Sequence, residues 1–192
     1  MYILKETGEI VDNCQKRPQR LFEERELSVD ECAGYLQKAI NLLKSQTAAS
    51  GSSEGTLKVI ITVSPIRYAK YGYHGSQLSK ATLLLAADKL VKENPGVVSY
   101  FPAYEIMNDE LRDYRFYKED MLHPSEQAVE YIWERFRATY FGKAAELFLE
   151  DWRPIREALG HKPFHPESEE HQKFIARTEE KKRQFEEKYH LL

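Results

Sequence analysis

The segment of residues 57–63 constrains the fold more than any other part of the chain. It reads Leu57-Lys-Val-Ile-Ile-Thr-Val63, a nearly continuous run of β-branched residues. β-Branched residues favour extended backbone, and a run without polar alternation is typical of a strand covered on both faces in a parallel sheet. Parallel strands need crossover connections, which are usually helices. We therefore expect an α/β fold built around this strand.

The neighbouring segments have the patterns that such a fold requires. Ser28 and Glu31 form a capping box at the start of an amphipathic helix. A second apolar stripe predicts a helix over residues 79–92 with Ser79 as its N-cap, ended by Asn94-Pro95-Gly96. Residues 97–101 then predict another strand. The order helix, strand, helix, strand favours an α/β sandwich with right-handed crossovers.

The number of strands is small for such a sandwich. Residues 1–13 predict a short strand or hairpin that turns at Thr7-Gly8, and residues 46–55 predict a flexible polar connector. This leaves two clear strands and one weaker one, whereas a doubly wound sheet usually has about five. Either further strands lie within residues 1–27, or the chain lacks the first part of its domain.

The second half of the chain is predicted to be helical. Ser125 caps an amphipathic helix that Gly142 interrupts, and the pattern resumes up to Gly160. A last helix is expected over about residues 167–189, with acidic residues early and basic residues late, as the helix dipole favours. Its apolar positions are sparse, so we expect it to be peripheral. We predict a domain over residues 1–141 and a C-terminal helical extension over residues 142–192.

Composition excludes several classes of function. The 192 residues carry a formal net charge of −3, so a nucleic acid is not expected as the main partner. No apolar run approaches the length of a membrane span, and no signal-peptide core is visible near the N-terminus. Cys14 and Cys32 are expected to be free thiols. We therefore predict a cytoplasmic protein that does not contact membranes.

One pair of residues suggests catalysis. Asp120 and His123 stand three residues apart just before a helix, where a carboxylate can hold Nδ1 of the imidazole and leave Nε2 free to take a proton. The alternative is an exposed carboxylate beside a histidine at a helix entry. Ser64, at the end of the strand, is a candidate nucleophile. Pro65 has no N–H group for an oxyanion hole, so we expect a turn there instead.

Other candidate site residues follow the strand or lie near the C-terminus. Arg67 is a candidate for binding an anionic substrate group and His74 for lining a pocket, with surface roles as the alternatives. Three histidines suggest a metal site: His161, His165 and His171. Pro163 and Pro166 prevent these histidines from sharing one helical face, so no metal and no cofactor are expected.

Several motifs, in order, resemble the GSCFA domain. They are the segments 62–65, 74–84, 100–106, 109–117, 120–125 and 131–133. Asn13-Cys14-Gln15-Lys16 is similar to the family's Asn-Cys-His-Lys, with glutamine in place of histidine. The resemblance covers roughly residues 2–140. The GSCFA domain is similar to the SGNH (GDSL-like) hydrolases, which have a three-layer α/β/α fold.

The resemblance implies ester hydrolysis through a serine, with an Asp-x-x-His motif supplying the other two members of the triad. Here those positions are Asp120 and His123. The Gly-Ser-Cys-Phe-Ala motif that carries the family's expected nucleophile is absent, and so are the residues expected to form the oxyanion hole. We therefore expect the C-terminal portion of a GSCFA domain, without its N-terminal strands, that is inactive or weakly active alone. The implied substrate is a small-molecule or carbohydrate ester.

The sequence leaves two other hypotheses for the function of the chain open. The chain would be a non-catalytic α/β module that forms a homodimer, or binds a partner, through an exposed sheet edge and its last helix. Alternatively, a second polypeptide would supply the serine and complete the site in trans.

Overall fold

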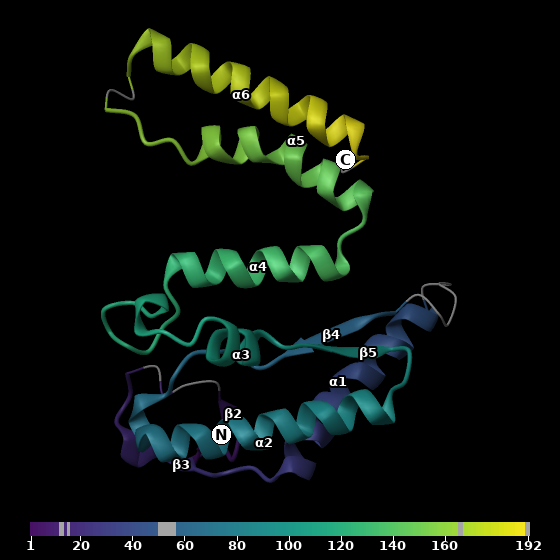
Figure 1. The fold of residues 1–192 in the computed structure, drawn as a ribbon, viewed down its shortest axis with the longest axis vertical. Coiled ribbons are helices and arrows are strands. Elements are labelled where there is room, and N and C mark those ends of the chain that lie inside the picture. The colour runs from purple at the N-terminus through teal and green to yellow at the C-terminus, as the bar shows by residue number, and fades with distance from the viewer. Residues whose placement is uncertain (12–13, 15, 50–56, 165–166, 191–192) are drawn as a thin grey trace. The chain divides into compact units, whose positions relative to one another are not determined.

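A computed structural model describes residues 1–11, 14, 16–49, 57–164 and 167–190 (Figure 1). These residues divide into two units, 1–132 and 133–192. The first is mixed α/β and contains two small sheets. The second is helical.

The long β-branched run forms one strand of a parallel pair. Strand β4 (Val59–Thr62) pairs with β5 (Val98–Phe101), and helix α2 (Gly72–Glu93) connects them. Val59 stands opposite Val98 at one end, and Thr62 stands opposite Phe101 at the other. The predicted parallel strands with a helical crossover are therefore confirmed.

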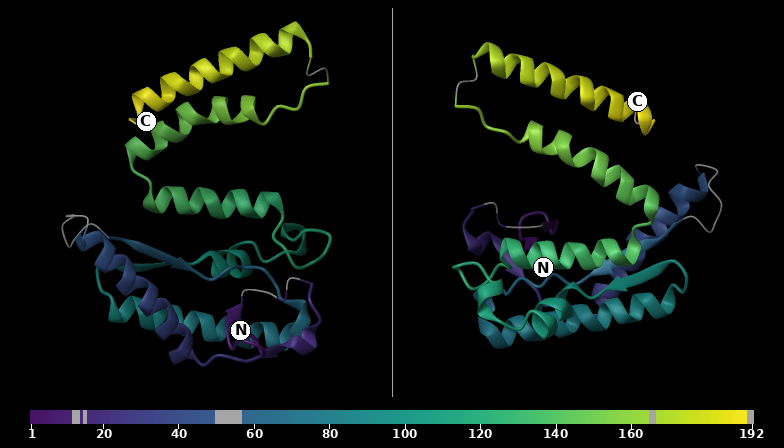
Figure 2. Two further views of the ribbon diagram at one scale, coloured as in Figure 1. Left: turned by 180° about the vertical axis from the view of Figure 1, so that it is seen from behind. Right: turned by 45° about the horizontal axis from the view of Figure 1, so that its top comes forward.

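One face of this sheet is covered by two helices. Helix α1 (Val29–Ala49) and α2 lie side by side against it, as Figures 1 and 2 show. They form a core of buried residues against which Val59 and Ile61 pack: Ala33, Ile40, Ala86, Leu90 and Val98. Ile60, which alternates to the other face, keeps 38% of its surface exposed. The prediction that β4 is covered on both faces is therefore wrong for the described residues.

The helix boundaries differ from the prediction in two places. Helix α2 begins at Gly72 instead of near Ser79, because a short 3₁₀ turn, η2 (Ala69–Tyr71), leads directly into it. The φ angle of +69° at Gly72 allows this change of direction, so Ser79 lies inside the helix and does not cap it. Helix α1 has the predicted capping box and extends into the expected connector; residues 50–56 lie outside the described residues.

A separate antiparallel sheet forms at the N-terminus. Strands β1 (Tyr2–Leu4), β2 (Ile10–Val11) and β3 (Phe22–Glu24) pair in the order β2-β1-β3, and the 3₁₀ turn η1 (Gln19–Leu21) precedes β3. The predicted turn at Thr7-Gly8 is confirmed, with Gly8 at φ +72°. Residues 1–27 thus contain an additional strand, but it does not join β4 and β5.

The segment after β5 builds a second small core. Helix α3 (Ala103–Glu105) continues into a π-helical turn, η3 (Ile106–Glu110), in which Leu111 N donates to Ile106 O at 3.0 Å. A 3₁₀ turn, η4 (Tyr114–Phe116), and helix α4 (Glu126–Tyr140) follow, the latter capped by Ser125 as predicted. The buried members of this core are Met107, Leu111 and Ala128.

Two helices dominate the C-terminal unit. Helix α5 (Lys143–Leu159) lies between the two predicted breaks at Gly142 and Gly160 and packs beside α6 (Glu169–Lys188), as both views in Figure 2 show. Four aromatic rings join them, with centroids 4.7 to 5.1 Å apart: Phe148, Trp152, Phe185 and Tyr189. Phe185 is buried, so α6 is held more firmly than its sparse apolar pattern indicates.

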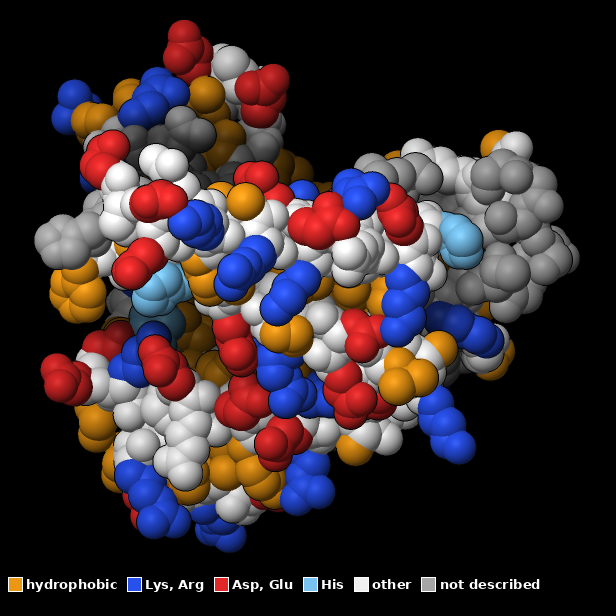
Figure 3. Space-filling model, turned by 90° about the horizontal axis from the view of Figure 1, so that it is seen from above, with side chains coloured by type: hydrophobic (Ala, Val, Ile, Leu, Met, Phe, Trp, Pro, Cys, Tyr) orange, Lys and Arg blue, Asp and Glu red, His pale blue; other side chains and the backbone are white. Residues whose placement is uncertain are grey.

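The surface of α6 carries charges of both signs. Lys173 pairs with Glu169 at 2.5 Å and Arg183 with Glu187 at 3.0 Å, each one helical turn apart. Acidic and basic side chains are interspersed over the face in Figure 3. None of the described helices is long and apolar enough to span a lipid bilayer.

Substitutions at Leu90 and Leu85 test which face of α2 is buried. Leu90 is fully buried, so Leu90→Ala should lower the free energy of unfolding by about 2–5 kcal/mol through lost burial and a cavity. Leu85→Ala, on the same helix at 57% exposure, should change it by about 0.5 kcal/mol or less. Urea denaturation followed by circular dichroism measures both. Similar losses for the two variants would contradict this arrangement of α2.

Candidate functional site

The Asp120 to His123 segment forms a loop that is closed at its base. Tyr117 and Pro124 make an isolated antiparallel bridge, and Lys118 N donates to His123 O at 2.8 Å. Met121 within the loop has a φ angle of +58°, which turns the chain tightly. The backbone therefore fixes the position of the two predicted residues.

The loop brings the two side chains into direct contact. Asp120 Oδ2 lies 2.5 Å from His123 Nδ1. The other carboxylate oxygen, Oδ1, accepts hydrogen bonds from the backbone N–H groups of Leu122 at 2.8 Å and His123 at 3.0 Å. The histidine is thus oriented by a carboxylate that is itself held by the backbone.

The hydrogen bonds also fix the charge of the carboxylate. The backbone N–H groups of His123 and Leu122, together with the imidazole, lower the pKa of Asp120 to about 2. An ionised carboxylate can only accept, so Nδ1 carries the proton and Nε2 is the basic nitrogen of the neutral ring. His123 keeps 52% of its side chain exposed, which leaves Nε2 accessible.

No serine in the described part of the chain is hydrogen-bonded to His123. Three serines that border this region use their hydroxyl oxygens to accept from backbone N–H groups: Ser64 from Ile66 (3.3 Å), Ser76 from Tyr68 (3.1 Å) and Ser125 from Ala128 (3.3 Å). Among the described residues, the oriented histidine therefore has no serine partner.

Arg67 joins this loop to the end of β4. Its backbone N donates to Leu122 O at 3.0 Å, and its Nη1 donates to Met121 O at 3.2 Å. Its guanidinium lies near the rings of three tyrosines: Tyr73 (4.8 Å from the centroid), Tyr117 (5.1 Å) and Tyr114 (5.7 Å). The structure thus places Arg67, a predicted site residue, beside the Asp120–His123 loop.

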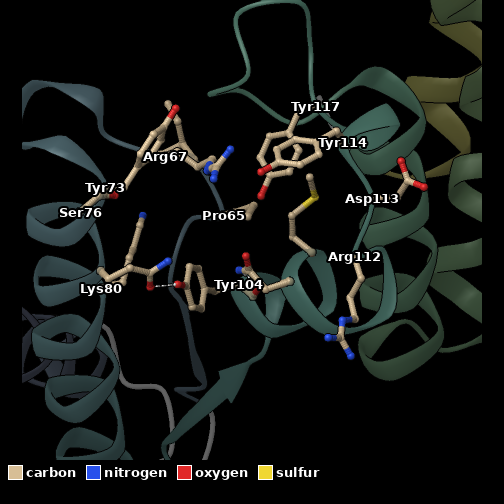
Figure 4. Close-up of a pocket in the computed structure, with 14 residues that line it drawn as sticks. Pro65, Arg67, Tyr73, Ser76, Lys80, Tyr104, Arg112, Asp113, Tyr114 and Tyr117 are labelled. Carbon is tan, nitrogen blue, oxygen red and sulfur yellow. Dashed lines mark hydrogen bonds between the residues drawn. The ribbon is translucent and has the colours of Figure 1, made fainter.

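A pocket of about 250 Å³ opens beside Arg67. Figure 4 shows the guanidinium of Arg67 directed into the space between α2 and Tyr117. The pocket is lined by segments far apart in the sequence: the loop after β4, α2, α3 with η3, and η4. The parallel pairing of β4 and β5 brings these segments to one edge of the sheet, where ligands of α/β proteins gather.

Lys80 in this pocket was not identified from the sequence. It is only 8% exposed, and its Nζ donates to Ser64 O at 2.6 Å. Burial lowers the pKa of its ammonium group. One feature of the sequence indicates that Lys80 faces the protein interior. It lies in the apolar stripe of α2, three residues before Leu83 and seven before Ala87.

The remaining candidate residues lie elsewhere. His74 is exposed on α2 and does not line the pocket. His161 and His171 each contact the ring of Phe174 in the second unit, and His165 lies outside the described residues. Among the residues with assigned positions, no group of three potential metal ligands comes together. The two cysteines are free thiols, as expected.

We expect the carboxyl group of Asp120 to titrate with a pKa of about 2, below its ordinary 3.8. Because the folded-state pKa is depressed, its contribution to stability is complete above about pH 4 and is lost as the pH falls toward 2. Carbonyl-detected NMR measures the titration, and Asp120→Asn identifies the resonance. A pKa near 3.8 would contradict the hydrogen bonds to the two backbone N–H groups.

Comparison with known families covers most of the chain. Residues 1–136 match the model of the GSCFA family, and residues 152–192 match that of the GSCFA domain protein, C-terminal domain. No curated protein and no solved structure matches the chain. The first match extends over well more than half of the sequence and includes the Asp120–His123 loop and the residues that line the pocket. The chain therefore belongs to the GSCFA family.

Proposed function

We propose that Asp120 and His123 form the base of an ester-hydrolysing site whose serine comes from a segment outside the described residues. The observation that carries this proposal is the 2.5 Å contact between Asp120 Oδ2 and His123 Nδ1, with Asp120 itself held by two backbone N–H groups. A histidine oriented in this way is the general base of serine hydrolases.

The chemistry assigns one role to each side chain. His123 Nε2 takes the proton of the serine hydroxyl while the serine oxygen attacks the ester carbonyl. The imidazolium then gives this proton to the departing alcohol, which leaves an acyl-serine. A water molecule, deprotonated by the same nitrogen, releases the acid and restores the serine. Asp120 stays ionised throughout and stabilises the imidazolium.

We further propose that the parallel sheet is part of a three-layer α/β/α sandwich like that of the SGNH hydrolases. The two-stranded sheet and the 38% exposure of Ile60 on its second face support this proposal. Further strands would extend β4–β5 and bring a nucleophile to the same edge of the sheet. On this proposal Arg67 contributes to binding a small-molecule or carbohydrate ester, whereas the exposed position of His74 outside the pocket gives it no part in binding.

His123→Ala is the decisive variant. In the chain combined with a second polypeptide that carries the Gly-Ser-Cys-Phe-Ala motif, we expect it to lower kcat/KM for p-nitrophenyl acetate by about 10²–10⁴-fold, because the general base is lost. Asp120→Asn should also lower it, because an amide can present the wrong hydrogen-bonding atom to Nδ1 and does not stabilise the imidazolium. Initial rates of p-nitrophenol release measure both effects.

The matched control is His161→Ala, which removes an exposed histidine of the second unit. It should hydrolyse the ester at the rate of the wild type, which excludes non-specific attack by surface imidazoles. Hydrolysis that survives His123→Ala unchanged would sink the proposed role, and so would a complete lack of hydrolysis by the combined polypeptides.

A second candidate function is a non-catalytic module that associates through its sheet. Each strand of the β4–β5 pair has one edge that no strand in the described ranges occupies, and Ile60 is partly exposed beside it. Light scattering after size exclusion should then give twice the 22.5 kDa of one chain. Ile60→Lys should restore the monomer, whereas a wild-type monomer would remove this candidate.

A further inference from the structure

The pocket contains a buried cation that lacks an anionic partner. The ammonium group of Lys80 has the Ser64 carbonyl as its hydrogen-bond acceptor, and no carboxylate in the described ranges forms an ion pair with it. Burial lowers the pKa of this group, since its charge is incompletely compensated. A buried charge without a partner is unfavourable for stability, so its presence in a pocket points to a ligand.

Arg67 adds a second positive charge to the same pocket. Its guanidinium contacts tyrosine rings and a backbone carbonyl, all of them uncharged. Asp113 is the one carboxylate among the lining residues, and it accepts from Arg115 N at 2.9 Å. Figure 4 shows Asp113 at the far side of the pocket from Lys80. The space between Lys80 and Arg67 therefore favours an anion.

Other lining groups suit a hydroxylated ring. Tyr73 and Tyr114 are 62% and 61% exposed, so their rings remain available for contact with a flat apolar face. Gln77 Oε1 accepts from Tyr104 OH at 2.7 Å, which leaves the amide N–H groups for a ligand. Asn108 Nδ2 donates to Tyr104 O at 2.7 Å, which leaves its amide oxygen. A donor and an acceptor for hydroxyl groups are thus in place.

The pocket has room for a small ligand. Its volume of about 250 Å³ is below the usual range for drug-sized ligands, which favours a molecule of about one ring. The π-helical turn η3 places Met107 and Asn108 in the lining. Such turns are rare and are found frequently at functional sites. The lining of the pocket thus includes a backbone geometry that recurs at functional sites.

We propose that this pocket binds an oxyanion group, a carboxylate or a phosphate, on a hydroxylated ring the size of one monosaccharide. Lys80 and Arg67 bind the anionic group, and Gln77 and Asn108 bind ring hydroxyls. The statement that this molecule is part of the substrate rests on the proposed esterase function. Binding itself requires neither the serine nor His123.

NMR titration of the full chain tests the proposal. The probes are D-galacturonate, D-glucuronate, galactose 6-phosphate, inorganic phosphate and neutral D-galactose. At least one anionic sugar should bind about tenfold or more tightly than D-galactose, with shifts in the amides of residues 65–80 and 104–117. The uronates and the sugar phosphate distinguish the two sources of the anion, and inorganic phosphate shows how much the ring contributes.

Variants separate this site from the proposed catalysis. Lys80→Met and Arg67→Gln should each weaken binding of the preferred anionic sugar about tenfold or more. Lys92→Met, at an exposed lysine of the same helix, should leave binding unchanged. His123→Ala should also leave binding unchanged, so a failure of ester hydrolysis and a failure of this pocket give different results. Thermal unfolding shows whether each variant is folded. If Lys80→Met does not fold, the loss of binding in Arg67→Gln alone tests the proposal.

Three results would overturn the proposal. They are equal binding of neutral and anionic sugars, absence of binding by all the anionic probes, and binding that persists unchanged in both Lys80→Met and Arg67→Gln.

Discussion

The parallel pairing of β4 with β5 is the constraint on which the candidate site depends. Parallel strands place their carboxyl ends at one edge of the sheet, so the segment after Thr62 and the segment after Phe101 emerge together. The first segment carries Arg67 and the second carries the Asp120–His123 loop. The hydrogen bond from Arg67 N to Leu122 O joins the two at 3.0 Å. A change in the register of this pair would therefore displace the pocket and the histidine together.

Two opposite electrostatic arrangements lie side by side at this edge. Asp120 is solvated, yet backbone N–H groups and the imidazole keep it ionised to low pH. Lys80 is buried and has a neutral acceptor. In the first arrangement, the carboxylate finds its hydrogen-bond partners within the loop itself. The second leaves the ammonium group without an anionic partner among the described residues. This contrast is the reason for proposing catalysis at the first position and anion binding at the second.

The sequence predicted the local features of this fold better than its layers. Caps at Ser28 and Ser125 and breaks at Gly142 and Gly160 depend on neighbouring residues, and all four are present. The contact between Asp120 and His123 was predictable for the same reason. Whether both faces of β4 are covered depends on segments remote in the sequence, and the β-branched run alone does not decide it. Lys80 was missed although it lies in the apolar stripe of α2, because a lysine is rarely buried and a helical pattern alone does not show that this one is.

Two features of the first unit lack a counterpart among the described residues. They are the second face of β4 and the Nε2 atom of His123. Ile60 leaves apolar surface that a further layer would bury, and the imidazole is oriented for a proton donor that the described residues do not provide. In the proposed sandwich, a further layer would bury Ile60 and a further strand would bring the serine to the carboxyl edge of the sheet. The pocket imposes no such requirement, because Lys80, Arg67 and the amide side chains all belong to residues 1–132. The proposed recognition of an anionic ring therefore depends on this unit by itself, whereas the proposed ester hydrolysis depends on a serine from outside the described residues.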